Sequence, residues 1–115
     1  MDSNARGGIA ELEIAAAAVR LGVPVLKPLT EHGRYDLAFE IGRRLLRVQC
    51  KWAGLAEDRR TVKVHMRRSR CTPNGYVLSS YAEHEIDLLA AYCGDLDRCF
   101  LLPAAVVAGR TRDLP

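Results

Sequence analysis

The sequence predicts an α/β fold in which a mixed β-sheet is flanked by helices. Three observations support this: an Ala-rich helical segment comes first, segments with the two-residue period of strands fill the middle, and a helical segment followed by a strand comes last. This order is typical of a sheet that packs against helices. The length of 115 residues and the 49% hydrophobic content fit one domain, residues 1–115.

The first element is predicted as a helix from about Ile9 to Leu21, because this stretch lacks interior Gly and Pro and is followed by Gly22 and Pro24. On a helical wheel its apolar arc contains Leu12, Ile14, Ala15, Ala18, Val19 and Leu21. Glu11 falls at the centre of this arc. An interior carboxylate costs several kcal/mol unless it is compensated, so we expect Glu11 to meet a cation, a metal or a hydrogen-bond network.

Strands are predicted next, over residues 23–27, 35–40, 45–52 and 61–66. The second and third form a hairpin around the turn Ile41-Gly42-Arg43. Apolar residues alternate with polar ones in both, so Asp36 lies opposite the apolar face of its strand, and Gln49 and Lys51 lie opposite the apolar face of theirs. We expect the hairpin to bring these three side chains to one surface, where Glu11 would complete the cluster.

The remaining elements are signalled by turn residues. Pro73-Asn74-Gly75 precedes a predicted strand over residues 76–79. Ser80-Tyr81-Ala82-Glu83 then has the form of a capping box and predicts a helix that runs to about Cys93 and ends at Gly94. Glu83, Glu85 and Asp87 would lie in its first turns. A last strand is expected from Arg98 to Leu102.

Charge is distributed unevenly, although the net charge is only +3. Residues 43–70 carry ten Lys or Arg and two acids, whereas residues 81–97 carry five acids and neither Lys nor Arg. A polyanion therefore has one obvious place to bind. The candidates for phosphate contact are Lys63, Arg67, Arg68 and Arg70.

Other classes of protein are disfavoured. The four cysteines show no Cys-x-x-Cys pair and no His at zinc-finger spacing, which argues against a structural zinc site. No signal peptide and no stretch long enough to span a bilayer is recognised, so we expect a cytoplasmic protein with reduced thiols and no membrane association.

The predicted cluster suits phosphodiester hydrolysis. Asp36, the amide oxygen of Gln49 and Glu11 are oxygen ligands of the kind that Mg²⁺ prefers. Such a cation stabilises charge in the transition state and lowers the pKa of a bound water. Lys51 would orient that water and neutralise the scissile phosphate.

These residues resemble a known family. Glu11 on the first helix, followed by Tyr35-Asp36 and then Gln49-Cys50-Lys51, is similar to the PD-(D/E)xK nuclease superfamily, with the helix Glu placed as in archaeal Holliday junction resolvases. The sequence more closely resembles the small intron-encoded homing endonucleases, in which Gln takes the second acidic position. Further agreement comes from Arg68-Ser69-Arg70, from Tyr81 with Glu85-Ile86-Asp87-Leu88, and from Phe100-Leu101-Leu102-Pro103.

The resemblance implies a restriction-endonuclease-like core that cleaves double-stranded DNA with Mg²⁺ or Mn²⁺. It also implies that Asp36, Gln49 and Glu11 hold the cation and that Lys51 acts at the nucleophile. Tyr35 replaces the Pro of the motif. The neutral Gln49 removes one negative charge, which weakens cation binding unless Glu11 contributes.

Two other functions remain open at the level of sequence. A junction resolvase shares the site but reads DNA shape, and a non-catalytic DNA-binding module keeps only the fold. One such site cuts one strand, so cleavage of a duplex requires at least two copies, and a homodimer or homotetramer is expected.

Overall fold

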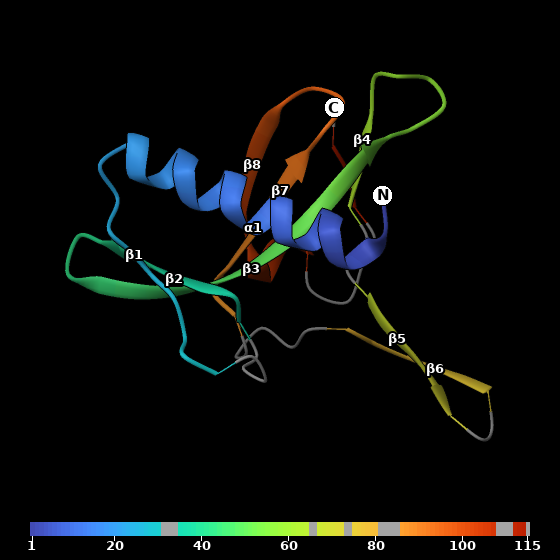
Figure 1. Ribbon diagram of the computed structural model, residues 1–115, viewed down its shortest axis with the longest axis horizontal. Helices are drawn as coiled ribbons and strands as arrows, with labels where there is room; N and C mark the ends of the chain where they lie inside the picture. Colours follow the sequence, from blue (N-terminus) through green and yellow to red (C-terminus); the bar gives the residue numbers. More distant parts are fainter. Residues whose placement is uncertain (31–34, 65–66, 73–74, 81–85, 108–111, 115) are drawn as a thin grey trace.

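The computed structural model describes residues 1–30, 35–64, 67–72, 75–80, 86–107 and 112–114 (Figure 1). In chain order these residues form α1 (Ser3–Arg20), β1 (Val25–Leu26), β2 (Leu37–Ile41), β3 (Arg44–Leu55), β4 (Val62–Val64), β5 (Arg67–Thr72), β6 (Gly75–Ser80), β7 (Leu88–Cys93), β8 (Arg98–Pro103), α2 (Ala104–Val107) and β9 (Arg112–Leu114). The sheet contains parallel and antiparallel pairs, which confirms the predicted mixed α/β class.

The sheet is organised on β3, which pairs with three strands along its length. Residues 44–48 pair antiparallel with β2, residues 48–53 pair parallel with β7, and residues 54–55 pair antiparallel with β4. β1 and β8 extend the sheet beyond β2 and β7, and β9 pairs with β4. The predicted hairpin turn is confirmed, and Gly42 adopts a φ of 65°, where a residue without a Cβ is favoured.

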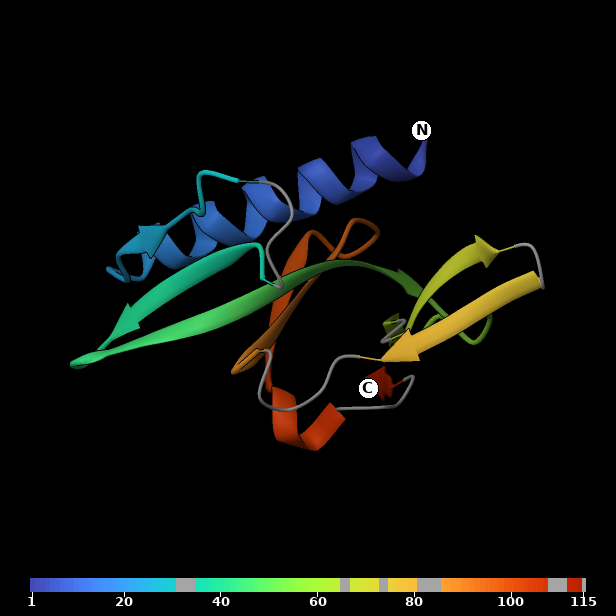
Figure 2. The same cartoon turned by 90° about the horizontal axis from the view of Figure 1, so that it is seen from below.

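α1 crosses one face of this sheet (Figures 1 and 2). It begins at Ser3, six residues before the predicted start, because the carboxylate of Asp2 caps it by accepting a hydrogen bond from the Ala5 N–H at 2.8 Å. Its C-terminal end is as predicted, since Gly22 follows with a φ of 83°. No helix in the described part of the chain combines the length and apolar character needed to cross a membrane.

α1 buries a narrower stripe than the helical wheel predicts. Its buried residues are Ala10, Ile14 and Ala18. Leu12, Val19 and Leu21, which the wheel assigned to the apolar arc, are exposed. The small residues of the stripe let the helix backbone come close to the sheet, where they pack with Leu37, Phe39, Val48, Ala90 and Tyr92.

The predicted helix from Ser80 to Cys93 is wrong. Residues 81–85 lie outside the described part, but Leu88–Cys93 is β7, a central strand between β3 and β8. All its residues after Leu88 are buried, because α1 covers one face and Val62 and Val64 contribute to the core on the other. A strand buried on both faces has no alternating pattern, so the apolar run Leu-Leu-Ala-Ala does not distinguish a strand from a buried helix.

β5 and β6 form a separate two-stranded antiparallel sheet, which we call the ribbon (residues 67–72 and 75–80). The ribbon projects beyond the main sheet in both views (Figures 1 and 2). β6 was predicted as the strand over residues 76–79, whereas β5 was not predicted. The predicted strand over residues 61–66 is confirmed for Val62–Val64, and residues 65–66 lie outside the described part.

Gly94, at the end of β7, provides a test of this packing. A Cβ added at Gly94 would lie 2.6 Å from the Cη2 of Trp52, whose ring also packs edge-on against Tyr92. We expect Gly94→Ala to lower the free energy of unfolding by about 1–3 kcal/mol, because the indole must move out of its site.

Urea unfolding checks this prediction, with Gly54→Ala as the matched control. Gly54 also lies at the sheet, but nothing comes within 4 Å of its added Cβ. An equal loss of stability in both variants would contradict the assigned contact.

Candidate active site at the fork between β2 and β3

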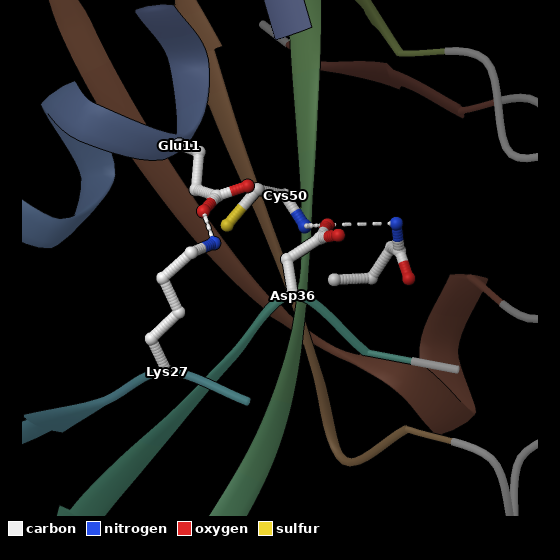
Figure 3. Close-up of polar contacts among 5 residues, drawn as sticks. Glu11, Lys27, Asp36 and Cys50 are labelled. Carbon is white, nitrogen blue, oxygen red and sulfur yellow. Dashed lines mark hydrogen bonds and ion pairs between the residues drawn. The ribbon is translucent and has the colours of Figure 1, made fainter. Parts of the chain in front are cut away.

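The candidate site is centred on Asp36, at the point where β2 separates from β3. The Asp36 N–H donates to the Val48 carbonyl at 2.9 Å, one residue before β2 begins. Its carboxylate then takes the place of the next backbone acceptor, since Oδ2 accepts a hydrogen bond from the Cys50 N–H at 2.8 Å (Figure 3). The fork therefore fixes both the backbone and the side chain of Asp36.

Gln49 contacts Asp36 directly. Its Nε2 donates to Oδ2 of Asp36 at 2.8 Å. Gln49 is 8% exposed and is the one buried polar side chain among the described residues. The orientation of a side-chain amide is assigned from its hydrogen-bond partners, and here the partner is a carboxylate, which requires the N–H₂ group to face Asp36.

Glu11 lies on α1 beside this pair, and Lys27, just after β1, reaches it. Nζ of Lys27 forms an ion pair with Oε1 of Glu11, and Figure 3 shows Glu11, Lys27, Asp36 and Cys50 converging. The side chain of Glu11 is 26% exposed, so it lies at the edge of the apolar stripe. The expectation that Glu11 needs a charged partner is met by Lys27.

Glu11 and Asp36 both line an open polar hollow of about 270 Å³, whose other lining residues are Lys27, Pro28, Leu29, Thr30 and Tyr35. Gln49 contacts Asp36 from β3 and the charge of Lys51 acts on it, but neither residue is among those that line this hollow. The predicted grouping of Asp36 with Gln49 is therefore present as a direct contact, and the hollow joins Glu11 to Asp36.

Comparison with known proteins identifies the family of the chain. The family model of the PD-(D/E)XK endonucleases matches residues 1–113. The chain belongs to the PD-(D/E)XK endonuclease family. Among solved structures, it is similar to the bacterial homing endonuclease I-Ssp6803I, with 30% sequence identity and a TM-score of 0.88 over all of this chain and 79% of that one. The comparison with curated proteins found no match.

Burial and neighbouring charges both act on the Asp36 carboxyl of this PD-(D/E)XK site. Burial raises the pKa of the Asp36 carboxyl above its ordinary value, and the negative charge of Glu11 raises it further. The hydrogen bond from the Cys50 N–H and the charges of Lys51 and Lys27 lower this pKa. The charges of Asp36 and Glu11 therefore repel each other at this site.

Among the described residues no group of three or more His, Cys, Asp and Glu is arranged to hold a metal. Of the three ligands that the sequence predicts, Asp36 and Glu11 line the hollow, whereas Gln49 turns its Nε2, and not its amide oxygen, towards Asp36. The thiol of Cys50 does not belong to these ligands, because burial and the charges of Asp36 and Glu11 raise its pKa and keep it protonated.

Asp87, which the sequence assigned to a helix start, supports β3 on its other edge. Its N–H donates to the Arg47 carbonyl at 2.9 Å, and its Oδ2 accepts from the Arg47 N–H at 2.8 Å and from Nε at 3.1 Å. These hydrogen bonds lower the pKa of the Asp87 carboxyl. Asp87 thus positions the strand that carries Gln49 and Lys51.

The predicted DNA-contacting residues lie away from this fork. Lys63 is exposed on β4, and Arg67, Arg68 and Arg70 lie on β5 of the ribbon. Of these four, only Lys63 has a described side chain.

Lys27 is the site residue that the sequence did not predict. It follows a strand of only two residues, which is too short to establish a period, and it lies sixteen positions from Glu11. The demand of Glu11 for a cationic partner was the signal that pointed to such a residue.

Proposed function

We propose that this chain is a Mg²⁺-dependent endonuclease that hydrolyses phosphodiester bonds of double-stranded DNA, in the manner of a homing endonuclease. The observation that carries the proposal is the cluster at the fork: the Asp36 carboxylate, held by Gln49 and the Cys50 N–H and facing the charge of Glu11, on the strand that carries Lys51. Membership of the PD-(D/E)XK family and similarity to a homing endonuclease support it.

Each residue has a proposed role. Asp36, Glu11 and the amide oxygen of Gln49 hold the cation, which requires the Gln49 amide to turn its oxygen towards Asp36. When bound, Mg²⁺ or Mn²⁺ stabilises charge on the phosphate in the transition state and lowers the pKa of a coordinated water. Lys51 orients the attacking water and neutralises the scissile phosphate.

The ribbon supports the choice of DNA as substrate. The major groove of B-DNA admits a two-stranded antiparallel ribbon, and β5 carries three arginines over four residues, Arg67–Arg70. We propose that these arginines and Lys63 contact phosphates and base edges.

One site cuts one strand, so a homodimer or homotetramer would cut a duplex. The free thiols of Cys50, Cys93 and Cys99 fit the cytoplasm as the compartment.

Cleavage of pooled plasmids with randomised inserts tests the proposal, because the target is then selected by the protein. We expect cuts at a defined sequence in Mg²⁺, none in EDTA, and a rate about 10²-fold lower for Lys51→Ala. Arg98→Gln, which removes an exposed charge from β8, serves as the matched control.

The other functions left open by the sequence give different results. Preferential, symmetrical nicking of a four-way junction would replace the homing function with that of a resolvase. If wild type and Lys51→Ala both bind DNA and show the same background cleavage, the protein is a non-catalytic DNA-binding module.

A further inference from the structure

Glu11 and Lys27 differ in how firmly they are held. The side chain of Lys27 is 65% exposed and follows a two-residue edge strand, whereas that of Glu11 is 26% exposed and lies on a helix fixed by buried residues on either side of it in sequence, Ala10 and Ile14. When their ion pair breaks, Lys27 moves into water at little cost while Glu11 stays in place. The carboxylate is thus the fixed partner and the ammonium the exchangeable one.

The charges around Lys27 give its ammonium the surroundings of a cation site. It touches Oε1 of Glu11, and the charges of both Glu11 and Asp36 act to raise its pKa. Both carboxylates line the hollow that Lys27 also lines. A lysine ammonium is a compact point charge without fixed directional demands, so it can neutralise a pair of carboxylates as a small cation does.

An ammonium and a divalent cation compete for the same oxygen atoms. Glu11 can join a hard cation only if that cation comes close to Oε1 or Oε2, and either position puts it next to the Lys27 charge. Like charges at that separation repel, so the two occupants exclude each other. The resting ion pair therefore opposes cation binding.

We propose that Lys27 is an internal counterion that holds Glu11 in the cation-free site and must be displaced when a divalent cation binds, so that Lys27 sets the cation affinity of the site. The inference rests on the proposed function, because it assigns Glu11 to the cation. Lys27 is on this view a positioning residue, which acts through Glu11 and does not itself bind the cation.

Calorimetric titration with Mg²⁺ in the absence of DNA tests the proposal through a double-mutant cycle of Lys27→Met and Glu11→Gln. We expect Lys27→Met to tighten Mg²⁺ binding by about three- to tenfold, because the competitor is gone. In the Glu11→Gln background the same substitution is expected to change the affinity less than about twofold. Arg98→Gln, which removes one exposed charge elsewhere, is expected to leave the affinity unchanged.

Any other result of this double-mutant cycle overturns the inference. A tightening that persists in the Glu11→Gln background would show that Lys27 acts only as a remote charge, and weaker binding by Lys27→Met would show that it helps to assemble the site. DNA cleavage measured in parallel separates failure of this inference from failure of the proposed function. If the wild type neither binds Mg²⁺ nor cuts DNA, the inference and the proposed function are both overturned. If the wild type binds Mg²⁺ and cuts DNA but Lys27→Met has the same Mg²⁺ affinity, only the inference is overturned.

Discussion

Asp36→Asn is expected to lower Mg²⁺-dependent DNA cleavage by about 10³-fold or more while leaving the fold intact. The loss of activity follows because the substitution removes one of the two carboxylates that face the hollow. The fold is kept because Asn has a side-chain oxygen that can replace Oδ2 of Asp36 as acceptor for Gln49 and for the Cys50 N–H.

The same variant is expected to be more stable than wild type without Mg²⁺ at pH 7. The raised pKa of Asp36 means that the folded protein holds this proton more tightly than the unfolded chain does. Ionising Asp36 therefore costs stability as the pH rises from about 4 through the folded-state pKa. The amide removes this cost, so the difference in melting temperature should vanish below about pH 4.

Thermal unfolding from pH 3 to pH 8 and plasmid cleavage on the same samples check both parts. Asp36→Ala is the companion variant: it loses activity as well but leaves the Cys50 N–H without its acceptor, so we expect it to be less stable than Asp36→Asn. Cleavage by Asp36→Asn at the wild-type rate would overturn the assignment of this carboxylate.

Gln49→Glu is expected to tighten Mg²⁺ binding by about tenfold or more, because it restores the negative charge that the neutral amide lacks. Without a cation the same change is expected to lower the free energy of unfolding by on the order of 3 kcal/mol. Nε2 of Gln49 donates to Oδ2 of Asp36 at 2.8 Å, and the side chain of Gln49 is 8% exposed. A glutamate at residue 49 would therefore place a second buried carboxylate against that of Asp36.

Calorimetry with Mg²⁺ and urea unfolding with and without Mg²⁺ measure the two effects. Gln49→Met is the matched control, because it removes the amide without adding a charge and is expected to bind Mg²⁺ more weakly than wild type. If Gln49→Glu and Gln49→Met bind Mg²⁺ equally well, residue 49 does not contact the cation.

The sequence predicts the part of the site that depends on the alternation of apolar and polar residues along β2 and β3. Alternation along β2 and β3, with the turn at Gly42, was enough to place Asp36 next to Gln49 and to put Lys51 on the same strand. The helix wheel likewise identified Glu11 as a residue in need of compensation. Along β2 burial alternates as the period predicts, whereas on β3 the adjacent residues Val48 and Gln49 are both buried.

The parts that failed depend on contacts distant in sequence. β7 reads as a helix because its burial comes from α1, β3 and β8 together, and none of these is visible within its own six residues. Lys27 gave no periodic signal, and the N-terminal start of α1 depends on a cap at Asp2 followed by two glycines that propensity alone disfavours. Local sequence is weakest where tertiary packing decides the conformation.

The hydrogen bond from the Cys50 N–H to Asp36 has an evolutionary consequence. The carboxylate closes the backbone fork and, in the proposed function, also holds the cation, so a single-nucleotide change from Asp to Asn would end catalysis and keep the architecture. If the proposed function holds, a gene copy released from selection for cleavage would have a short route to a stable protein that only binds DNA. The residue at the position of Asp36 is therefore the first to inspect when relatives are classified as nucleases or as proteins that only bind DNA.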